Sequence, residues 1–343
     1  MCLGLPHAGH PFRRVRKSEK AFRQRRTCGS TSGSKYYRTV SNSDAAAKCP
    51  TCEQPFGQNQ QPGRGVSVYL QELPLVFFTL LTQLAVGIVL VGQLMLVETG
   101  NDATRTLVQQ QSLAALAFFV AGTLASFFHT GSPRNSPFTL LNIGSSWLSR
   151  EIAMNCLTGL ALLWLAVLGR GKSAQEEFAA IVAIVVGILF IFVTSRVYNQ
   201  KYMPSWNNLG VLPAFLASML LLGTLWHGLV LAYAGLPVPL ASPTLAAVIG
   251  LTLMAVSLPL AAPDQSLVVN ERVMAVPYSC QSRARGLHAL LSGAGVCLFL
   301  WAVLCAPTGY LNATLVCLAF ALLAVGEIFG RLVFYWSYTR LGV

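Results

Sequence analysis

Residues 74–97 read PLVFFTLLTQLAVGIVLVGQLMLV, a run without a single charged residue. The hydrocarbon core of a bilayer is about 30 Å thick, and an α-helix of about 20 apolar residues crosses it. The run is long enough for one crossing. It therefore predicts a membrane-spanning helix.

Composition extends this prediction to the rest of the chain. Of the 343 residues, 54% are hydrophobic and 10% are charged, with a mean hydropathy of +0.57, whereas a soluble domain has roughly 25% charged residues. The alternating ten-residue pattern of a membrane β-barrel is absent from the sequence. We therefore predict an all-α integral membrane protein with a bundle of eight transmembrane helices. Besides 74–97, the runs of spanning length are 112–128, 151–169, 178–197, 210–234, 242–262, 287–306 and 311–336.

The first 67 residues have a different composition. They hold 12 of the 24 lysines and arginines but only three acidic residues, and much of the rest is Ser, Gly, Gln and Pro. Such a segment cannot bury a core, so we expect residues 1–67 to form a disordered basic tail and residues 68–343 a membrane domain. The tail would meet anionic lipid rather than nucleic acid. Cys49 and Cys52 form one CxxC pair, whereas structural zinc needs four ligands, so we expect no metal.

A polar connection follows the second predicted span. Residues 127–151 read FFHTGSPRNSPFTLLNIGSSWLSRE, in which His129 closes one span and Glu151 opens the next. The hairpin brings both side chains to the same membrane face, and residues 136–151 suit a short helix in the headgroup layer. Oxidation of a quinol needs two proton acceptors, and histidine and a partly buried glutamate both qualify. Alternatively, His129 is an interfacial hydrogen-bonding group and Glu151 is favoured by the helix dipole.

Five more residues are candidates for quinol binding or for docking a partner. Glu327 and Arg331 are one turn apart in the last span, and charges in a membrane are costly enough that they should pair or face the interior of the bundle. A structural ion pair is the first interpretation, and a proton path is the alternative. Arg134 and Arg150 lie in the polar connection. Trp206 flanks the loop after the fourth span, where aromatic residues usually anchor a helix.

Two other classes of membrane protein compete with a quinol site. A di-haem cytochrome needs four axial ligands, normally histidines inside spans, but the chain has five histidines and two of them lie in the tail. A secondary transporter of a small solute binds its substrate near the membrane centre, often between repeated halves. No repeat is evident, and the interiors of the spans lack charge apart from Glu327 and Arg331. The transporter nevertheless remains the alternative function.

Five motifs in order resemble the membrane anchor subunit of the bacterial dimethyl sulfoxide reductase family. They are ELPLVFF, HTGSP, SWLSREI, SRVYNQ with PSWNN, and GEIFGRLVFY, and the resemblance covers residues 70–343. His129 matches the family's histidine in HxGxP and Glu151 its glutamate in SREI, both associated with quinol oxidation.

The resemblance implies a multi-pass subunit of the bacterial inner (plasma) membrane that takes part in anaerobic respiration. Such a subunit holds no permanently bound cofactor and takes menaquinol as its substrate. Its implied partners are a four-cluster iron–sulphur subunit and a molybdopterin catalytic subunit, so the chain would be a non-autonomous part of an oxidoreductase. Basic residues in the loops favour cytoplasmic termini, whereas the resemblance implies the opposite orientation.

Overall fold

The computed structural model describes residues 72–129, 142–168, 173–199, 206–260, 278–306 and 309–336. Within these ranges there are eight long helices and no strand, and each helix is long and apolar enough to cross a membrane. The predicted all-α architecture with eight spans is therefore confirmed. The predicted tail, residues 1–67, lies outside the described residues.

The helices follow the predicted order, and their ends differ from the predicted ones by one to ten residues. Their bounds are α3 Leu73–Thr99, α4 Asp102–His129, α6 Trp147–Leu163, α7 Ser173–Tyr198, α8 Val211–Ala234, α9 Ala241–Leu260, α10 Tyr278–Leu304 and α11 Ala313–Trp336, and a π-helical turn, Trp164–Leu168, continues α6. α4 and α10 begin well before their apolar runs. Hydropathy detects only the part of a helix inside the hydrocarbon, whereas the helix itself begins at its cap. For α4 this cap is Asn101, whose Oδ1 accepts a hydrogen bond from the Thr104 amide at 2.7 Å.

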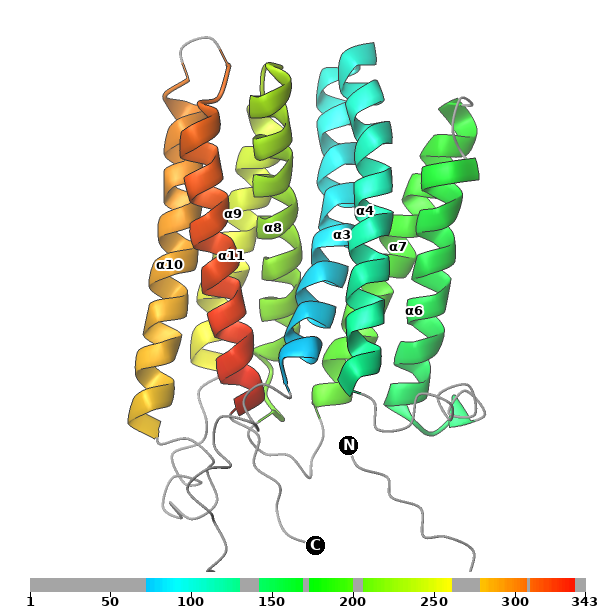
Figure 1. Ribbon diagram of the computed structural model, residues 1–343, viewed down its shortest axis with the longest axis vertical. Coiled ribbons are helices and arrows are strands. Elements are labelled where there is room, and N and C mark those ends of the chain that lie inside the picture. The colour runs from blue at the N-terminus through cyan, green and yellow to red at the C-terminus, as the bar shows by residue number, and fades with distance from the viewer. Residues whose placement is uncertain are drawn as a thin grey trace, which may run out of the picture. The chain divides into compact units, whose positions relative to one another are not determined.

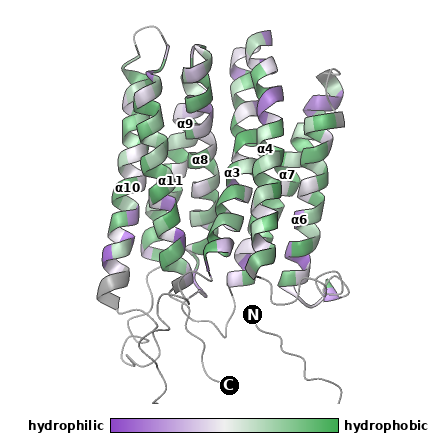
Figure 2. Cartoon of the chain, viewed as in Figure 1, coloured by the Kyte–Doolittle hydropathy of each residue, from purple (hydrophilic) through white to green (hydrophobic). Residues whose placement is uncertain are grey.

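Successive helices alternate in direction (Figure 1). α3, α6, α8 and α10 begin at the end of the bundle where α4, α7, α9 and α11 finish. We call this the lower end, as it is drawn in Figure 1. Figure 2 shows apolar residues along most of each helix, with polar residues concentrated towards the ends. This distribution is the one that a bilayer imposes on a spanning helix.

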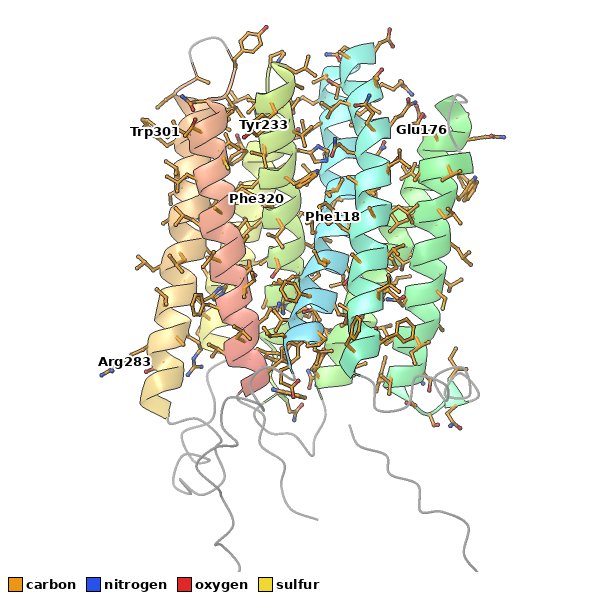
Figure 3. The ribbon with its side chains drawn as sticks, viewed as in Figure 1. Phe118, Glu176, Tyr233, Arg283, Trp301 and Phe320 are labelled. Atoms are coloured by element: carbon orange, nitrogen blue, oxygen red, sulfur yellow. The ribbon has the colours of Figure 1, made fainter. Side chains whose placement is uncertain are left out.

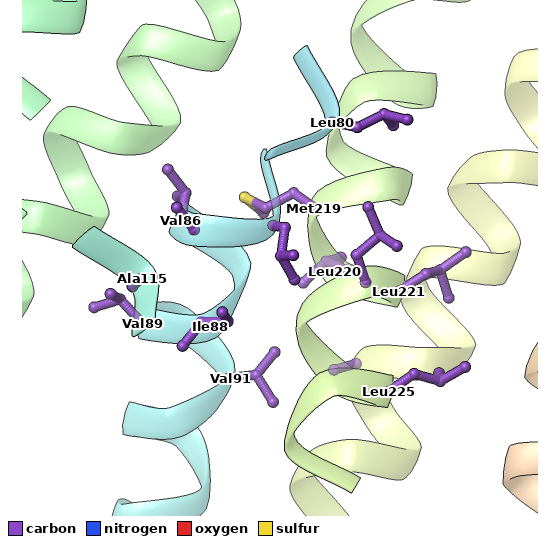
Figure 4. Packing of buried hydrophobic residues seen from close by; sticks show 14 of the residues in the cluster. Leu80, Val86, Ile88, Val89, Val91, Ala115, Met219, Leu220, Leu221 and Leu225 are labelled. Atoms are coloured by element: carbon purple, nitrogen blue, oxygen red, sulfur yellow. The ribbon is translucent and has the colours of Figure 1, made fainter. Parts of the chain in front are cut away.

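α3 and α8 form the centre of the bundle. In the spanning parts of these two helices, 78% and 72% of the residues are buried, the largest shares among the described spans. They approach closely at Gly87 and Gly223, where a Cβ atom added to Gly223 would lie 2.5 Å from the carbonyl carbon of Gly87. Small residues allow such an approach between membrane helices. Figure 4 shows the surrounding apolar packing, including Ile88 from α3 and Leu221 from α8.

A side chain from α3 also holds the start of α9 at the upper end. The carboxylate of Glu98 accepts hydrogen bonds from the backbone amides of Ala241 at 2.9 Å and Ser242 at 2.7 Å. These amides belong to the first turn of α9, where no carbonyl within the helix can accept from them. Outward-facing side chains on the spans are large and apolar, as at Trp301, which is 55% exposed (Figure 3). The outer surface therefore suits lipid.

Candidate functional site

The two residues at the ends of the polar connection lie on adjacent helices. His129 is the last residue of α4, and Glu151 lies in the second turn of α6. The hydroxyl of Thr123 on α4 donates to Asn155 Oδ1 on α6 at 3.2 Å. From this contact, His129 is six residues and Glu151 four residues nearer the lower end, about 9 Å and 6 Å along their helices. The backbone thus brings both positions to one end of the bundle.

The side chain of His129 and residues 130–141 lie outside the described residues, as does Arg134. The pairing of the imidazole with the carboxyl group therefore stays a prediction. The proposed headgroup helix over 136–151 is described only from residue 142 onward. There, residues 142–146 form a turn and α6 begins at Trp147, with the Ser146 hydroxyl accepting from the Ser149 amide at 3.4 Å. Residues 147–150 thus belong to the third span, because Ser146 caps that helix.

Glu151 has a buried side chain that is only 7% exposed. The hydroxyl of Thr194 on α7 faces its carboxyl group. Nevertheless, Glu151 Oε1 and Thr194 Oγ1 are each buried without a hydrogen-bond partner among the described residues. A buried polar atom left unpaired costs free energy, so such atoms usually indicate a missing water or ligand. Two buried polar atoms, one on α6 and one on α7, are thus left for partners beyond the described side chains.

A cluster of aromatic side chains lies beside Glu151. Tyr198 ends α7, and its hydroxyl lies 3.2 Å from the hydroxyl of Tyr335 on α11, which in turn lies 3.5 Å from Thr79 Oγ1 on α3. Both tyrosines are close enough to Glu151 to interact with its charge. These hydroxyl groups extend the polar environment of Glu151 towards the centre of the bundle.

Trp206 belongs to the same aromatic cluster. Its indole stacks on Phe334 with a ring separation of 5.5 Å, and its Nε1–H donates to the Phe334 carbonyl at 2.8 Å. The side chain is buried, and its contacts with Phe334 hold the loop after α7 against the end of α11. This position explains a packing role, and a role in docking remains a prediction.

Arg150 points away from Glu151 towards the turn that precedes α6. Its Nε donates to the Ile143 carbonyl at 2.9 Å and its Nη2 to the Gly144 carbonyl at 2.7 Å. The guanidinium also lies 4.4 Å from the centre of the Trp147 ring. Arg150 thus holds the turn in place, and its predicted part in quinol binding is untested.

Glu327 and Arg331 are both buried, each only 4% exposed, but they are not the direct ion pair that the sequence suggested. Within the described ranges, the one ion pair closer than 4 Å joins Arg105 and Glu177 near the upper end. Instead, Ser218 on α8 lies between the two charges. Its hydroxyl donates to Glu327 Oε2 at 2.6 Å and accepts from Arg331 Nη2 at 2.8 Å. The hydroxyl of Ser218 bridges the two charged groups in place of the expected direct contact.

Sequence reasoning missed the neutral partners of these charged residues. Thr194, Tyr335 and Ser218 are ordinary residues of apolar spans when each span is considered alone. Gln83 could have been recognised from the sequence, because a side-chain amide in the middle of the run 74–97 needs a hydrogen-bond partner inside the membrane. Its partner is Arg331, whose Nη2 donates to Gln83 Oε1 at 2.8 Å.

Comparison with known proteins identifies related sequences. Residues 67–336 match the family described as DMSO reductase anchor subunit (DmsC). The C subunit of anaerobic dimethyl sulfoxide reductase from Haemophilus influenzae is 37% identical over 168 residues, and the YnfH subunit from Escherichia coli is 31% identical over 166. Each of these matches covers 48% of the present sequence and 58% of the relative.

A third relative matches over a longer part of the sequence. The C subunit of anaerobic dimethyl sulfoxide reductase from Escherichia coli is 29% identical over 290 residues, which cover 79% of the present sequence and 96% of the relative. No solved structure gives a significant match.

Proposed function

Because this protein belongs to the DMSO reductase anchor subunit family, we propose that it anchors a DMSO reductase-like complex in the bacterial inner membrane and oxidises menaquinol there. The electrons pass to a four-cluster iron–sulphur subunit, which supplies a molybdopterin catalytic subunit. The observation that carries the quinol part of the proposal is the buried Glu151 carboxyl group, whose Oε1 lacks a partner among the described residues.

In the proposed reaction, two side chains each accept one proton from the quinol. Menaquinol loses two protons and two electrons as its two C–OH groups become C=O groups. The Glu151 carboxylate accepts the proton of one hydroxyl group, and His129 accepts the proton of the other. Thr194 Oγ1 helps to orient the quinol, because it faces Glu151 and has no hydrogen-bond partner of its own among the described residues. The iron–sulphur subunit is the oxidant that takes both electrons.

Substitution of Glu151 by Gln tests this proposal. Glutamine keeps the size of the side chain but cannot accept the proton, so quinol oxidation by the assembled complex should fall by at least about 100-fold. His129→Ala should have a similar effect. Turnover is measured with a menaquinol analogue, and assembly is measured by co-purification of the partner subunits.

Two controls separate the loss of quinol oxidation from general damage. Electrons supplied directly by a reduced viologen dye should restore reduction of the terminal acceptor in both variants. Glu177→Gln alters an exposed glutamate at the upper end of α7 and should leave quinol turnover unchanged. Wild-type turnover in both Glu151→Gln and His129→Ala would refute the assigned roles.

A further inference from the structure

Two arginines on adjacent helices lie against one tryptophan at the lower end of the bundle. The guanidinium carbon of Arg150 on α6 lies 4.4 Å from the centre of the Trp147 ring, and that of Arg196 on α7 lies 5.4 Å from it. The two positive charges are therefore no further apart than the sum of these distances. All three side chains are half-buried. We call these three residues the arginine–tryptophan cluster.

The cluster lies at the level where the headgroups of one leaflet are expected. Trp147 is the first residue of α6, and Arg196 lies in the last turn of α7, so both belong to the lower ends of their spans. Tryptophan is enriched at the interface between hydrocarbon and water. Arginine at the end of a span extends its charge to the same interface while its stem contacts apolar surface. Both guanidinium groups thus lie within reach of lipid phosphates.

An exposed apolar stripe on α7 leads from Arg196 into the membrane. Its members are each 41–59% exposed, and they are Ile181, Val185, Leu189 and Phe192. Successive members, with Arg196 at the end, are three or four residues apart, so they share one face of the helix. Phe192 and Leu189 lie about 6 and 10 Å from Arg196 along the axis. Both therefore lie within the hydrocarbon of one leaflet, which is about 15 Å thick.

This combination is complementary to an anionic phospholipid. A guanidinium group presents a planar fork of N–H donors that suits phosphate oxygens, and its face can stack on an aromatic ring at the same time. Arg150 uses Nε and Nη2 to hold the Ile143 and Gly144 carbonyls, which leaves the N–H groups of its Nη1 for another acceptor. Those two carbonyls are neutral, so neither offsets the charge of Arg150. Basic pockets between spanning helices bind the headgroups of anionic lipids.

Separate anchoring of each helix accounts for less of this arrangement. Two cations near a medium of low dielectric constant repel each other, and long side chains at an interface can turn apart to reduce that repulsion. Here they instead approach one ring from two helices. An anion bound by both guanidinium groups offsets the repulsion. A carboxylate of a partner protein also carries such a charge, but it makes no use of an apolar stripe at the depth of the hydrocarbon.

We propose that Trp147, Arg150 and Arg196 bind the phosphate group of an anionic phospholipid, whose acyl chains lie along the exposed stripe of α7. A lipid held in this way joins α6 to α7. These are also the helices that carry Glu151 and Thr194, but Arg150 points away from Glu151, so the lipid occupies a separate site. Binding of the lipid does not depend on quinol oxidation.

Native mass spectrometry of the purified complex in detergent tests this inference. The complex is stripped of lipid, and phosphatidylglycerol or phosphatidylcholine with the same acyl chains is added. The wild type should bind the first phosphatidylglycerol at least about 10-fold more tightly than the first phosphatidylcholine. Arg196→Gln should weaken the binding of phosphatidylglycerol by about fivefold, and adding Arg150→Gln should weaken it by about fivefold again. Phosphatidylglycerol should raise the melting temperature of the wild type more than that of the double variant.

Arg283→Gln is the matched control. It makes the same substitution at an exposed arginine near the lower end of α10, on the opposite side of the bundle from α6 (Figures 1 and 3). It should leave the affinity for phosphatidylglycerol unchanged. Arg196→Lys keeps the charge but loses the planar fork, so it should retain part of the preference. An equal loss in Arg283→Gln and Arg196→Gln would reduce the effect to general surface charge and overturn the site.

Three further outcomes would also overturn the proposal. Equal affinity of the wild type for the two lipids would do so without any variant, even if the substituted proteins fail to assemble. Displacement of the lipid by millimolar inorganic phosphate would show that the acyl chains contribute nothing. Loss of the partner subunits from Arg196→Gln, with lipid binding unchanged, would assign the arginines to a protein interface.

These results are independent of the proposed function, because none of them measures turnover. Wild-type quinol turnover in Glu151→Gln, together with a preference for phosphatidylglycerol that depends on Arg196, would reject the quinol site and leave the lipid site standing. An inactive Glu151→Gln, together with equal affinity of the wild type for the two lipids, would do the reverse.

Discussion

Thr194, whose hydroxyl has no hydrogen-bond partner in the part of the chain that the structure describes, is the most informative neighbour of Glu151. Threonine in an apolar helix normally donates to a carbonyl one turn earlier, as Thr158 does to Met154 at 2.8 Å. Thr194 Oγ1 makes no such bond among the described residues, although it is buried. A hydroxyl held in this way is available to a ligand.

Replacement of Thr194 by Val should therefore weaken the use of quinol without disturbing the fold. Valine has nearly the same shape but no hydroxyl, so kcat/KM for a menaquinol analogue should fall by about 2- to 10-fold, the equivalent of one hydrogen bond. Ser195→Ala is the matched control. Its hydroxyl is buried on the next residue but donates to Phe192 on its own helix at 2.6 Å. Equal kinetics in Thr194→Val and the wild type would remove Thr194 from the site.

Sequence patterns identified the charged members of the site better than the neutral ones. Glu151, Glu327 and Arg331 stand out because a charge in an apolar run is rare. Tyr335 and Thr194 do not, since both occur routinely in spans and their importance comes from neighbours on other helices. Tyr198 and Tyr335 are 137 residues apart in the sequence. Only the packed structure shows which hydroxyl groups meet.

The contact between α3 and α8 depends on glycine. At Gly223 the nearest atoms to an added Cβ belong to the backbone of Gly87, which cannot turn aside as a flexible side chain would. The two helices must therefore separate to admit even a methyl group. This contact is also close in sequence to Gln83 and Ser218, whose hydrogen bonds to Arg331 require the helices to stay near each other.

Gly223→Ala should thus destabilise the bundle despite the better helix propensity of alanine. We expect a loss of about 1–3 kcal/mol, typical of overpacking in a tight core. The measurement is the midpoint of unfolding in a detergent titration. Gly293→Ala on α10 is the control, because an added Cβ there meets nothing within 4 Å, and it should be neutral or stabilising by up to about 1 kcal/mol. Equal loss in both variants would contradict the close approach.

The boundaries of the helices were harder to predict than their number. Eight apolar runs gave eight helices, because in a membrane each backbone polar group has to be satisfied within its own helix. The start of α4 was missed by ten residues, since DATRTLVQQQ is polar and lies on the part of the helix outside the apolar run. The cap at Asn101 is the signal that could have located it.

The assembled bundle places two tryptophans in different surroundings. Trp301 is 55% exposed on the outer surface of α10, whereas Trp206 is only 7% exposed inside the aromatic cluster. Lipid should therefore contact the first ring and not the second. The distinction follows from the packing of all eight spans, and the sequence of either segment alone does not reveal it.

Quenching of tryptophan fluorescence by brominated lipids tests this arrangement. In proteoliposomes, Trp301→Phe should reduce the fraction of the emission that the lipid quenches, because it removes a ring in direct contact with acyl chains. Trp206→Phe should leave that fraction unchanged or raise it. An equal decrease in both variants would contradict the burial of Trp206.

The bond between Gln83 and Arg331 also sets the order in which the protein can be completed. Gln83 lies in the first of the described spans and its partner Arg331 lies in the last of them, which is synthesised later. Until α11 has entered the bilayer, the amide of Gln83 must be shielded by the insertion machinery or by transient water. The hydrogen bonding of α3 is therefore completed only when α11 is in place. A ribosome that stalls before codon 331 leaves Gln83 without this partner inside the bundle.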